Sequence, residues 1–325
     1  MIPYSPPKAI DRVPLIDLAA SFSPDPAGRR EVAAVIRAAC RDIGFFYVEN
    51  HGVPRATLDD IIDLARTFFA LPDAEKRKVH IRNSPCSRGY EGLTAQTLDD
   101  GAPPDLKEGF GIGNDLDADH PYVRAGVPNT GANQWPDTPP DLRRRFEAYV
   151  DHMLALGRHL GGLIALSLDL DEDYFAEGLK EPMFVSRLLH YPPQPAEAAP
   201  NQIGAGAHTD WGFLTLLLQD DAGGLEVRNA AGDWISAPPI PGTIVVNLGD
   251  IMPILTNGLY QSTLHRVRNA APGDRYSVPT FFDPDYFYRV TCVPTCRPDN
   301  GEALTFSTTV GEHVAAMYRK TYGLG

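Results

Sequence analysis

Cysteine is scarce in this chain of 325 residues, which carries only Cys40, Cys86, Cys292 and Cys296. Four cysteines without dense, regular spacing exclude a small fold held together by disulfides. Cys292 and Cys296 have the spacing of half a zinc site, but no second Cys/His pair with suitable spacing accompanies them. We therefore expect four reduced, structural thiols in a cytoplasmic protein.

Long apolar runs and excess positive charge are also missing. No apolar stretch of about eighteen residues occurs, so we expect no membrane span, and residues 1–7 lack the basic and apolar segments of a secretory signal. The 29 Lys and Arg are outnumbered by 42 Asp and Glu, for a net charge of -13. This balance disfavours nucleic acid and anionic membranes as partners. We expect a cytoplasmic monomer that draws any anionic ligand in by local Arg or Lys.

Hydrophobic periodicity divides the chain into two parts. Helical spacing of apolar residues predicts helices over 29–43, 54–69 and 139–168, a short helix over 172–179 and a last one over 310–322. After residue 182, short β-like runs separated by Gly, Pro, Asn and Asp predict a sandwich or barrel. Strands are expected over 13–17, 45–48, 107–112, 184–191, 213–219, 225–228, 234–236, 243–247, 264–268 and 276–282.

The fold class that these patterns favour is mixed α/β with a mainly β core. We expect a single domain over 1–325: a helix-rich N-terminal part (1–181), a double-stranded β-helix or jelly roll (182–307) and a C-terminal helix (308–325). With 43% hydrophobic and 22% charged residues, the chain has enough apolar material for a sizeable core.

Two histidines and one aspartate form the most specific pattern in the chain. His208 and Asp210 stand two apart, and His265 follows 55 positions after the aspartate. Side chains two apart on a strand share a face, so His208 and Asp210 are predicted to bind one ion from adjacent corners, with His265 arriving from a distant strand. Two imidazoles and a carboxylate form the facial triad that holds iron(II) and leaves open coordination positions. Imidazole also suits zinc, nickel and copper, so these residues alone leave the metal open.

The remaining histidines have no cluster of ligand-type residues around them. For His51, a structural hydrogen bond in a turn is the better interpretation, and His190 should point away from Tyr191 on its strand.

Arg275 and Ser277 share a strand face and form a candidate anion site. A guanidinium matches the planar geometry of a carboxylate, and the hydroxyl can donate a further bond. A buried arginine needs a counter-ion, and Asp274 should point to the opposite side. Arg187 and Tyr191, four apart on an earlier strand, are further candidates, with the tyrosine toward the distal carboxylate of a ligand and the arginine toward the end nearer the metal. Because residues 272–274 read as a turn, an exposed Arg275 remains the alternative.

In their order and spacing, these motifs resemble the isopenicillin-N-synthase-like branch of the iron(II)/2-oxoglutarate dioxygenases, over nearly the whole chain. The matching segments are residues 13–17, 44–53, 88–90, 105–110, 133–136, 208–210, 247–250, 257–258, 265–267 and 275–277.

The resemblance implies iron(II) at His208, Asp210 and His265, and 2-oxoglutarate held by Arg275, Ser277 and Tyr191, with O2 as the further cosubstrate. The implied reaction couples oxidative decarboxylation of 2-oxoglutarate to hydroxylation or desaturation of a small organic molecule. Plant members of the family often carry an asparagine where this chain has Leu189, which changes the details of the expected cosubstrate pose.

Alternatives within and outside the family stay open. One is an oxidase or oxidative cyclase of the same fold. An ethylene-forming type of enzyme is a further one, because the pair Arg187 and Tyr191 also resembles the pattern of that branch. Another is a cupin-like metal-binding protein without oxygenase activity. For the substrate pocket, position beside the matched motifs and aromatic character favour Tyr90, Phe110, Trp211 and Phe282, although each of these could instead pack in the core.

Overall fold

The computed structural model describes residues 2, 4–99, 101–199, 201–269, 272–298 and 305–322. The α-helices are α1 (Pro26–Asp42), α2 (Arg55–Phe69), α3 (Asp73–Lys78), α4 (Pro121–Arg124), α5 (Leu142–Ser167), α6 (Ile251–Leu255) and α7 (Val310–Tyr322). The strands are β1 (Leu15–Asp17), β2 (Phe45–Glu49), β3 (Gly89–Glu91), β4 (Glu108–Gly113), β5 (Met183–Tyr191), β6 (Ala205–His208), β7 (Leu214–Gln219), β8 (Leu225–Arg228), β9 (Trp234–Ser236), β10 (Ile244–Leu248), β11 (His265–Val267), β12 (Arg275–Asp283), β13 (Arg289–Thr291) and β14 (Thr305–Thr309). Among the described helices, none has the length and apolar character needed to cross a membrane.

The long helices form where apolar periodicity predicts them. In α1 the Asp25 carboxylate accepts a hydrogen bond from the Ala27 amide at 2.9 Å, which caps the helix start, and Pro26 occupies the first turn. The buried stripe of α5 includes Phe146, Met153 and Leu160. Such one-sided burial is what stabilises a helix laid on a sheet.

The short helix predicted over 172–179 is wrong, because these residues form a run of turns. The amides of Tyr174 and Ala176 bond to carbonyls three residues back, and Gly178 lies so close to the Tyr288 ring that a Cβ atom there would be 2.5 Å from it. This close approach fixes the segment by tertiary packing, which the local pattern does not contain.

Two sheets make up the jelly-roll core. The larger has eight strands in the order β1-β2-β10-β7-β12-β5-β4-β3, and the smaller has four in the order β6-β11-β8-β9. Strands from the N-terminal part, β1 to β4, therefore belong to the same sheet as β5, β7, β10 and β12.

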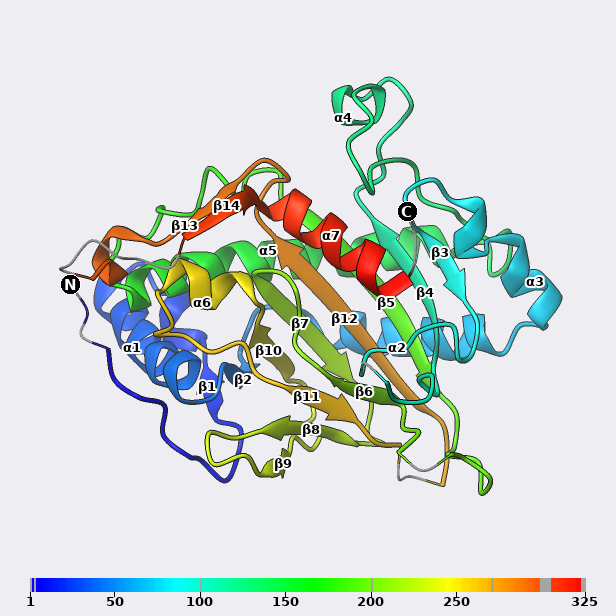
Figure 1. The fold of residues 1–325 in the computed structure, drawn as a ribbon, viewed down its shortest axis with the longest axis horizontal. Coiled ribbons are helices and arrows are strands. Elements are labelled where there is room, and N and C mark those ends of the chain that lie inside the picture. Colours follow the sequence, from blue (N-terminus) through cyan, green and yellow to red (C-terminus); the bar gives the residue numbers. More distant parts are fainter. Residues whose placement is uncertain are drawn as a thin grey trace.

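The larger sheet has a helix-covered face and an inner face. Leu188 of β5 packs in the core shared with α1, α2 and α5, whereas its neighbours Leu189 and Tyr191 pack in a second core with Leu225 and Val267 of the smaller sheet. Figure 1 shows α1, α2 and α5 behind the sheet and α7 crossing in front of β12 and β5. The inner face, between the two sheets, is therefore where a ligand can lie.

Candidate metal centre

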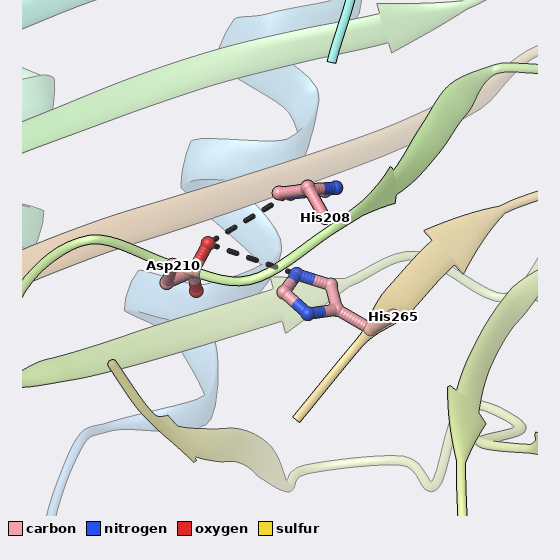
Figure 2. Close-up of side chains that lie close together, drawn as sticks. All are labelled: His208, Asp210 and His265. Atoms are coloured by element: carbon pink, nitrogen blue, oxygen red, sulfur yellow. Dashed lines mark ion pairs between the residues drawn. The ribbon is translucent and has the colours of Figure 1, made fainter. Parts of the chain in front are cut away.

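His208, Asp210 and His265 come together on the inner side of the smaller sheet. His208 is the last residue of β6, and it pairs with His265 of β11 across an antiparallel ladder. The Nε2 atoms of His208 and His265 lie 3.8 and 3.7 Å from Asp210 Oδ1 (Figure 2). Their possible ligand atoms all lie within 4.8 Å of one another. These separations exceed a direct hydrogen bond and leave space for one ion.

The prediction that His208 and Asp210 share a strand face is wrong in detail, because β6 ends at His208. Asp210 lies in the loop between β6 and β7, and its orientation is set by contacts of its own. Thr215 Oγ1 and Asn247 Nδ2 donate hydrogen bonds to Asp210 Oδ2 at 2.5 and 2.7 Å. This leaves Oδ1 to face the two imidazoles.

The protonation states of the trio suit a cation. His208 Nδ1 lies 2.7 Å from the carbonyl of Gly206, and His265 Nδ1 lies 3.1 Å from that of Thr263. A carbonyl oxygen only accepts, so both Nδ1 atoms carry the proton and both Nε2 lone pairs face the site. Burial, reinforced by His265, lowers the pKa of His208. Burial opposes ionisation of Asp210, but the neighbouring histidines and its two hydrogen bonds outweigh it and lower the pKa of this carboxyl. The result is a buried carboxylate that faces the Nε2 atoms of two imidazoles.

The other candidate ligands are engaged elsewhere. His51 Nδ1 accepts a hydrogen bond from the Val53 amide at 3.2 Å, as expected for a structural histidine. The four cysteines are buried and free of disulfides. Across the described residues, His208, Asp210 and His265 are the one group of His, Cys, Asp or Glu side chains arranged to hold a metal ion.

A cavity of about 140 Å³ adjoins the three ligand-type side chains and extends between the two sheets. Trp211, Val314 and Tyr318 form part of its wall, and the Trp211 and Tyr318 rings meet edge to face at 5.3 Å. The C-terminal helix α7, which carries Val314 and Tyr318, therefore closes one side of the cavity.

Arg275 lies at one end of this cavity and is fully buried. Its Nε donates to the Gly223 carbonyl at 2.7 Å, Nη1 to Ser277 Oγ at 3.1 Å and Nη2 to Gln219 Oε1 at 3.1 Å. The Tyr191 ring lies 4.6 Å from its Cζ atom. All of these partners are neutral, and no carboxylate of the described residues forms an ion pair with Arg275. The alternative of an exposed arginine beside a turn is therefore wrong.

Arg187 also lines the cavity, but its charge is balanced. Its Nη2 lies 2.7 Å from Glu91 Oε2, and both side chains are largely buried. Arg187 therefore differs from Arg275, because a carboxylate of the protein already accompanies it.

Of the four aromatic residues predicted for the substrate pocket, only Trp211 lines the cavity. Phe282 follows Phe281 on β12, and since side chains alternate, Phe281 faces the cavity while Phe282 packs against Gly157 of α5. Phe110 packs on Phe68 in the helix-covered core. Tyr90 donates to Glu108 Oε2 at 2.6 Å in the same core. The structure thus corrects the placement of Tyr90, Phe110 and Phe282.

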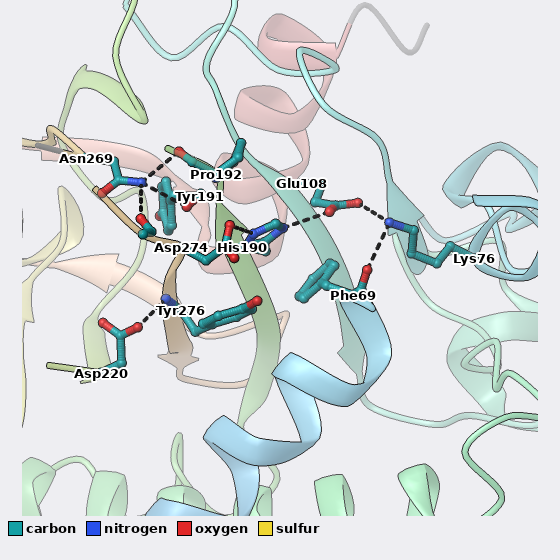
Figure 3. A network of polar contacts seen from close by, with 11 residues as sticks. Phe69, Lys76, Glu108, His190, Tyr191, Pro192, Asp220, Asn269, Asp274 and Tyr276 are labelled. Carbon is teal, nitrogen blue, oxygen red and sulfur yellow. Dashed lines mark hydrogen bonds and ion pairs between the residues drawn. The ribbon is translucent and has the colours of Figure 1, made fainter. Parts of the chain in front are cut away.

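On the outer face of β5 and β12, a polar network holds the strand ends that carry Tyr191 and Arg275 (Figure 3). His190 lies between Glu108 Oε1 at 2.8 Å and Asp274 Oδ1 at 2.9 Å, and Lys76 pairs with Glu108 at 2.8 Å. The predicted directions of His190 and Asp274, away from the ligand side, are confirmed by these contacts. Their effect is to fix the register of the two strands beside Arg275.

Several polar residues at the cavity were missed from the sequence. Lys107 lies 2.6 Å from Asp105, Arg88 lines the cavity wall, and Asp283 accepts a hydrogen bond from the Phe213 amide at 2.6 Å. Burial raises the pKa of Asp283 to about 7. Asp283 shares the face of Arg275 and Ser277 by its even spacing from them, so alternation along the strand was the available signal.

Two imidazoles and one carboxylate around one point, with an adjoining cavity between jelly-roll sheets, are the arrangement typical of the non-haem iron oxygenases. Comparisons place the chain within this class. Residues 13–138 match the N-terminal region of the non-haem dioxygenase in morphine synthesis, and residues 181–284 match the 2OG-Fe(II) oxygenase superfamily.

Individual proteins give the same result. The chain is 37% identical to the 2-oxoglutarate-Fe(II) type oxidoreductase hxnY of Emericella nidulans, covering 95% of this chain and 90% of that protein. It is 39% identical to the 2-oxoglutarate-dependent dioxygenase citB of Monascus ruber, covering 96% of each. A full-length Neurospora crassa protein crystallised with alpha-KG superposes with a TM-score of 0.84 and 28% identity, over 95% of this chain and 96% of that one.

The chain therefore belongs to the 2OG-Fe(II) oxygenase superfamily. It is a 2-oxoglutarate-dependent iron(II) dioxygenase whose cosubstrates are 2-oxoglutarate and O2.

Proposed function

We propose that His208 Nε2, His265 Nε2 and Asp210 Oδ1 bind the iron(II) of this dioxygenase, and that Arg275, Ser277 and Tyr191 bind the distal carboxylate of 2-oxoglutarate. The observation that carries the second assignment is a fully buried guanidinium without a carboxylate partner among the described residues. An unpaired buried charge is unfavourable, and a ligand carboxylate at this end of the cavity would remove that cost.

The surroundings of Arg275 suit 2-oxoglutarate in detail. Ser277 Oγ accepts a hydrogen bond from Arg275, so its own proton is available to a ligand oxygen. The Tyr191 hydroxyl donates to no acceptor among the described residues. Leu189, Leu217 and Val267 line the cavity and provide an apolar wall for the methylene groups. For Arg187 we propose a position at the end of the cosubstrate nearer the metal, with its charge balanced by Glu91.

The bound iron supplies the redox chemistry that couples O2 and the loss of carbon dioxide from 2-oxoglutarate to oxidation of the substrate. The protein's own residues hold the reactants and keep the cavity dry. The carbonyls of Gly206 and Thr263 keep the imidazole protons on Nδ1, and Thr215 and Asn247 hold the Asp210 carboxylate in one orientation.

The reaction proposed for this chain is hydroxylation or desaturation of a small organic molecule. In support, the Neurospora crassa protein was also crystallised with thymine. Trp211 and Phe281 are among the aromatic side chains that line the cavity, and they are our candidates for substrate contact. Measuring ethylene beside succinate separates this proposal from an ethylene-forming reaction.

We also propose that residues 1–325 act as a single oxygenase domain. The shared eight-stranded sheet supports this, since β1 to β4 pair with strands of the C-terminal part. Residues 1 and 323–325, at the ends of this range, lie outside the described residues. The monomeric state, the cytoplasmic location and the absence of a nucleic-acid partner stay predictions from the sequence.

The experiment that tests the site compares Arg275→Gln with Arg228→Gln, a matched change at an exposed strand position. Loss of a charge-assisted pair costs about 2 kcal/mol, so Arg275→Gln should raise the 2-oxoglutarate concentration needed for half-maximal succinate formation about 30-fold. Arg228→Gln should leave that concentration unchanged. His208→Ala should abolish iron(II) binding in an anaerobic titration. An unchanged 2-oxoglutarate requirement in Arg275→Gln would remove Arg275 from its assigned role.

A further inference from the structure

Four cationic side chains line the cavity, and three of them are accounted for. Lys107 pairs with Asp105 at 2.6 Å, and Arg187 pairs with Glu91 at 2.7 Å. Arg275 is assigned above to 2-oxoglutarate. The fourth is Arg88, which has no carboxylate within ion-pair distance in the part of the chain that the structure describes.

Arg88 is 4% exposed, and most of its hydrogen-bonding capacity is unused. Its Nη2 donates to the Asn129 carbonyl at 3.3 Å, whereas Nε and Nη1 are buried without a hydrogen-bond partner. Buried charged groups are ordinarily paired, and buried polar groups are ordinarily hydrogen-bonded. A guanidinium beside a ligand cavity that has no carboxylate partner, and two of whose nitrogens have no acceptor, indicates a group supplied by the ligand.

Arg88 lies far from the arginine assigned to the cosubstrate. Its guanidinium packs on Gly113, where a Cβ atom would come within 2.3 Å of it, and Gly113 is paired with Val185 of β5. Arg275 is paired with Tyr191, six residues further along the same strand. At ~3.3 Å per residue this is roughly 20 Å of strand, so 2-oxoglutarate bound at Arg275 does not reach Arg88.

The cavity lining beside Arg88 includes several apolar side chains together with Asp283 and the ion-paired Arg187. Met183, Val185 and Phe281 line this part of the cavity. Tyr318 of α7 lies beside Arg88, and the two side chains are close enough to hydrogen-bond. A ligand here would meet apolar side chains beside a positive charge and a phenol.

We propose that the prime substrate carries a carboxylate that binds Arg88, with an apolar segment of several bonds between that carboxylate and the reacting carbon. A single negative charge balances the single uncompensated guanidinium, which favours a carboxylate over a doubly charged phosphate. The inference rests on the proposed function, because it places 2-oxoglutarate at Arg275 and the reaction beside His208, Asp210 and His265. It adds the chemical class of the substrate to that function.

The test measures binding with defined probes in the full-length, iron(II)-loaded protein under anaerobic conditions. Saturating 2-oxoglutarate keeps Arg275 occupied. The probes are 3-phenylpropionate and 5-phenylpentanoate, each with its neutral carboxamide. The quenching of Trp211 fluorescence reports binding, because this indole lines the cavity, and a Trp211→Phe variant supplies the background of Trp135 and Trp234.

At least one carboxylate should bind about 10-fold or more tightly than its carboxamide, since a hydrogen bond to a charged group is worth more than a neutral one. Arg88→Gln should remove this preference and leave the affinities for the carboxamide and for 2-oxoglutarate unchanged. Arg82→Gln, at an exposed position nearby, is the matched control and should behave as the parent protein. If Arg88→Gln does not fold, Arg88→Lys and Tyr318→Phe take its place. Each of these variants should show a reduced preference for the carboxylate over its carboxamide.

Equal affinity for carboxylates and carboxamides overturns the proposal, as does a parent protein that binds none of the carboxylates. An equal loss of both probe types in Arg88→Gln overturns it too, because a purely structural Arg88 would not discriminate between them. Failure of the parent protein to bind 2-oxoglutarate in the same samples would instead contradict the proposed function.

Discussion

At the scale of single residues, the metal centre depends on side chains that touch the ligands rather than the ion. Thr215 donates to Asp210 Oδ2 at 2.5 Å, and both side chains are buried. Thr215→Val keeps the shape and removes this donor, so the Asp210 carboxylate loses part of its orientation. Changes of this kind cost about 10- to 100-fold in metal affinity. We predict such a loss in anaerobic iron(II) titrations with 2-oxoglutarate present.

The control for this prediction is Thr243→Val. Thr243 is also buried, and its Oγ1 donates to the Ile240 carbonyl at 2.9 Å, away from the metal ligands. Iron affinity should stay at the parent value in this variant. A Thr215→Val protein with parent iron affinity would show that Asn247 alone is sufficient to orient Asp210.

The sequence predicted residue identities well where chemistry and spacing combined. His208, Asp210 and His265 meet as expected, and Arg275 and Ser277 share the cavity face. The substrate residues were chosen by aromatic character, and three of the four lie in the core. The same alternation that paired Arg275 with Ser277 would have selected Phe281 in place of Phe282, because only odd positions of β12 face the cavity. Asp283 could have been found by the same alternation, whereas Arg88 required the tertiary structure to show that its charge lacks a carboxylate partner.

At the scale of secondary-structure elements, His190 of β5 connects Glu108 of β4 with Asp274, which directly precedes β12. This histidine changes its protonation state with pH. Burial alone would lower the pKa of His190, but its hydrogen bonds to Glu108 and Asp274 outweigh this and raise it. A raised pKa in the folded state stabilises the protein fully below the unfolded value of about 6.5, and this stabilisation is lost as pH rises through the folded pKa. In the parent protein, the free energy of unfolding should therefore fall as pH rises from roughly 6.5 to the pH at which folded His190 has lost its proton. We predict that this fall is absent in His190→Gln.

Urea unfolding at a series of pH values from 6 to 9 tests this prediction. The difference in unfolding free energy between parent and His190→Gln should be largest at the acidic end and shrink as pH rises. His152→Gln, on the partly exposed side of α5, controls for loss of a histidine elsewhere. A difference that stays constant over this range would mean that His190 contributes packing on Tyr276, which it stacks at 4.9 Å, and not charge.

Elements were predictable where the local pattern was long, and less so where tertiary contacts decide. The helices α1, α2 and α5 and most strands fall within a few residues of their predicted bounds. The strand β6, which carries His208, was not predicted, because its four residues are too few for a period to show. The spacing of two placed His208 and Asp210 on one strand, whereas β6 ends at His208 and hydrogen bonds from Thr215 and Asn247 orient Asp210 in the following loop.

At the scale of the whole molecule, the last helix completes a cavity that the two sheets begin. The N-terminal helices cover one face of the larger sheet, and α7 covers the cavity on the other (Figure 1). The sequence predicted both sets of helices and the jelly roll. It gave no signal for where α7 lies, because helix periodicity identifies a buried face but not the surface that buries it.

The docking of α7 depends on Gly311, and this gives a prediction in which two effects of known sign compete. A Cβ atom at this position would lie 2.1 Å from Tyr286 Cδ2 and 2.2 Å from Cγ, near the root of a buried ring. Helix propensity alone would make Gly311→Ala stabilising by up to ~1 kcal/mol, whereas overpacking costs about 1–3 kcal/mol. The collision should prevail and shift α7 outward, so we predict a lower melting temperature and stronger acrylamide quenching of Trp211.

Ala316→Gly, on the exposed side of α7, weakens the helix without that collision and should leave the quenching unchanged. A more stable Gly311→Ala protein with unchanged quenching would show that the Tyr286 side chain moves to accommodate the methyl group. The position of α7 would then not depend on this contact.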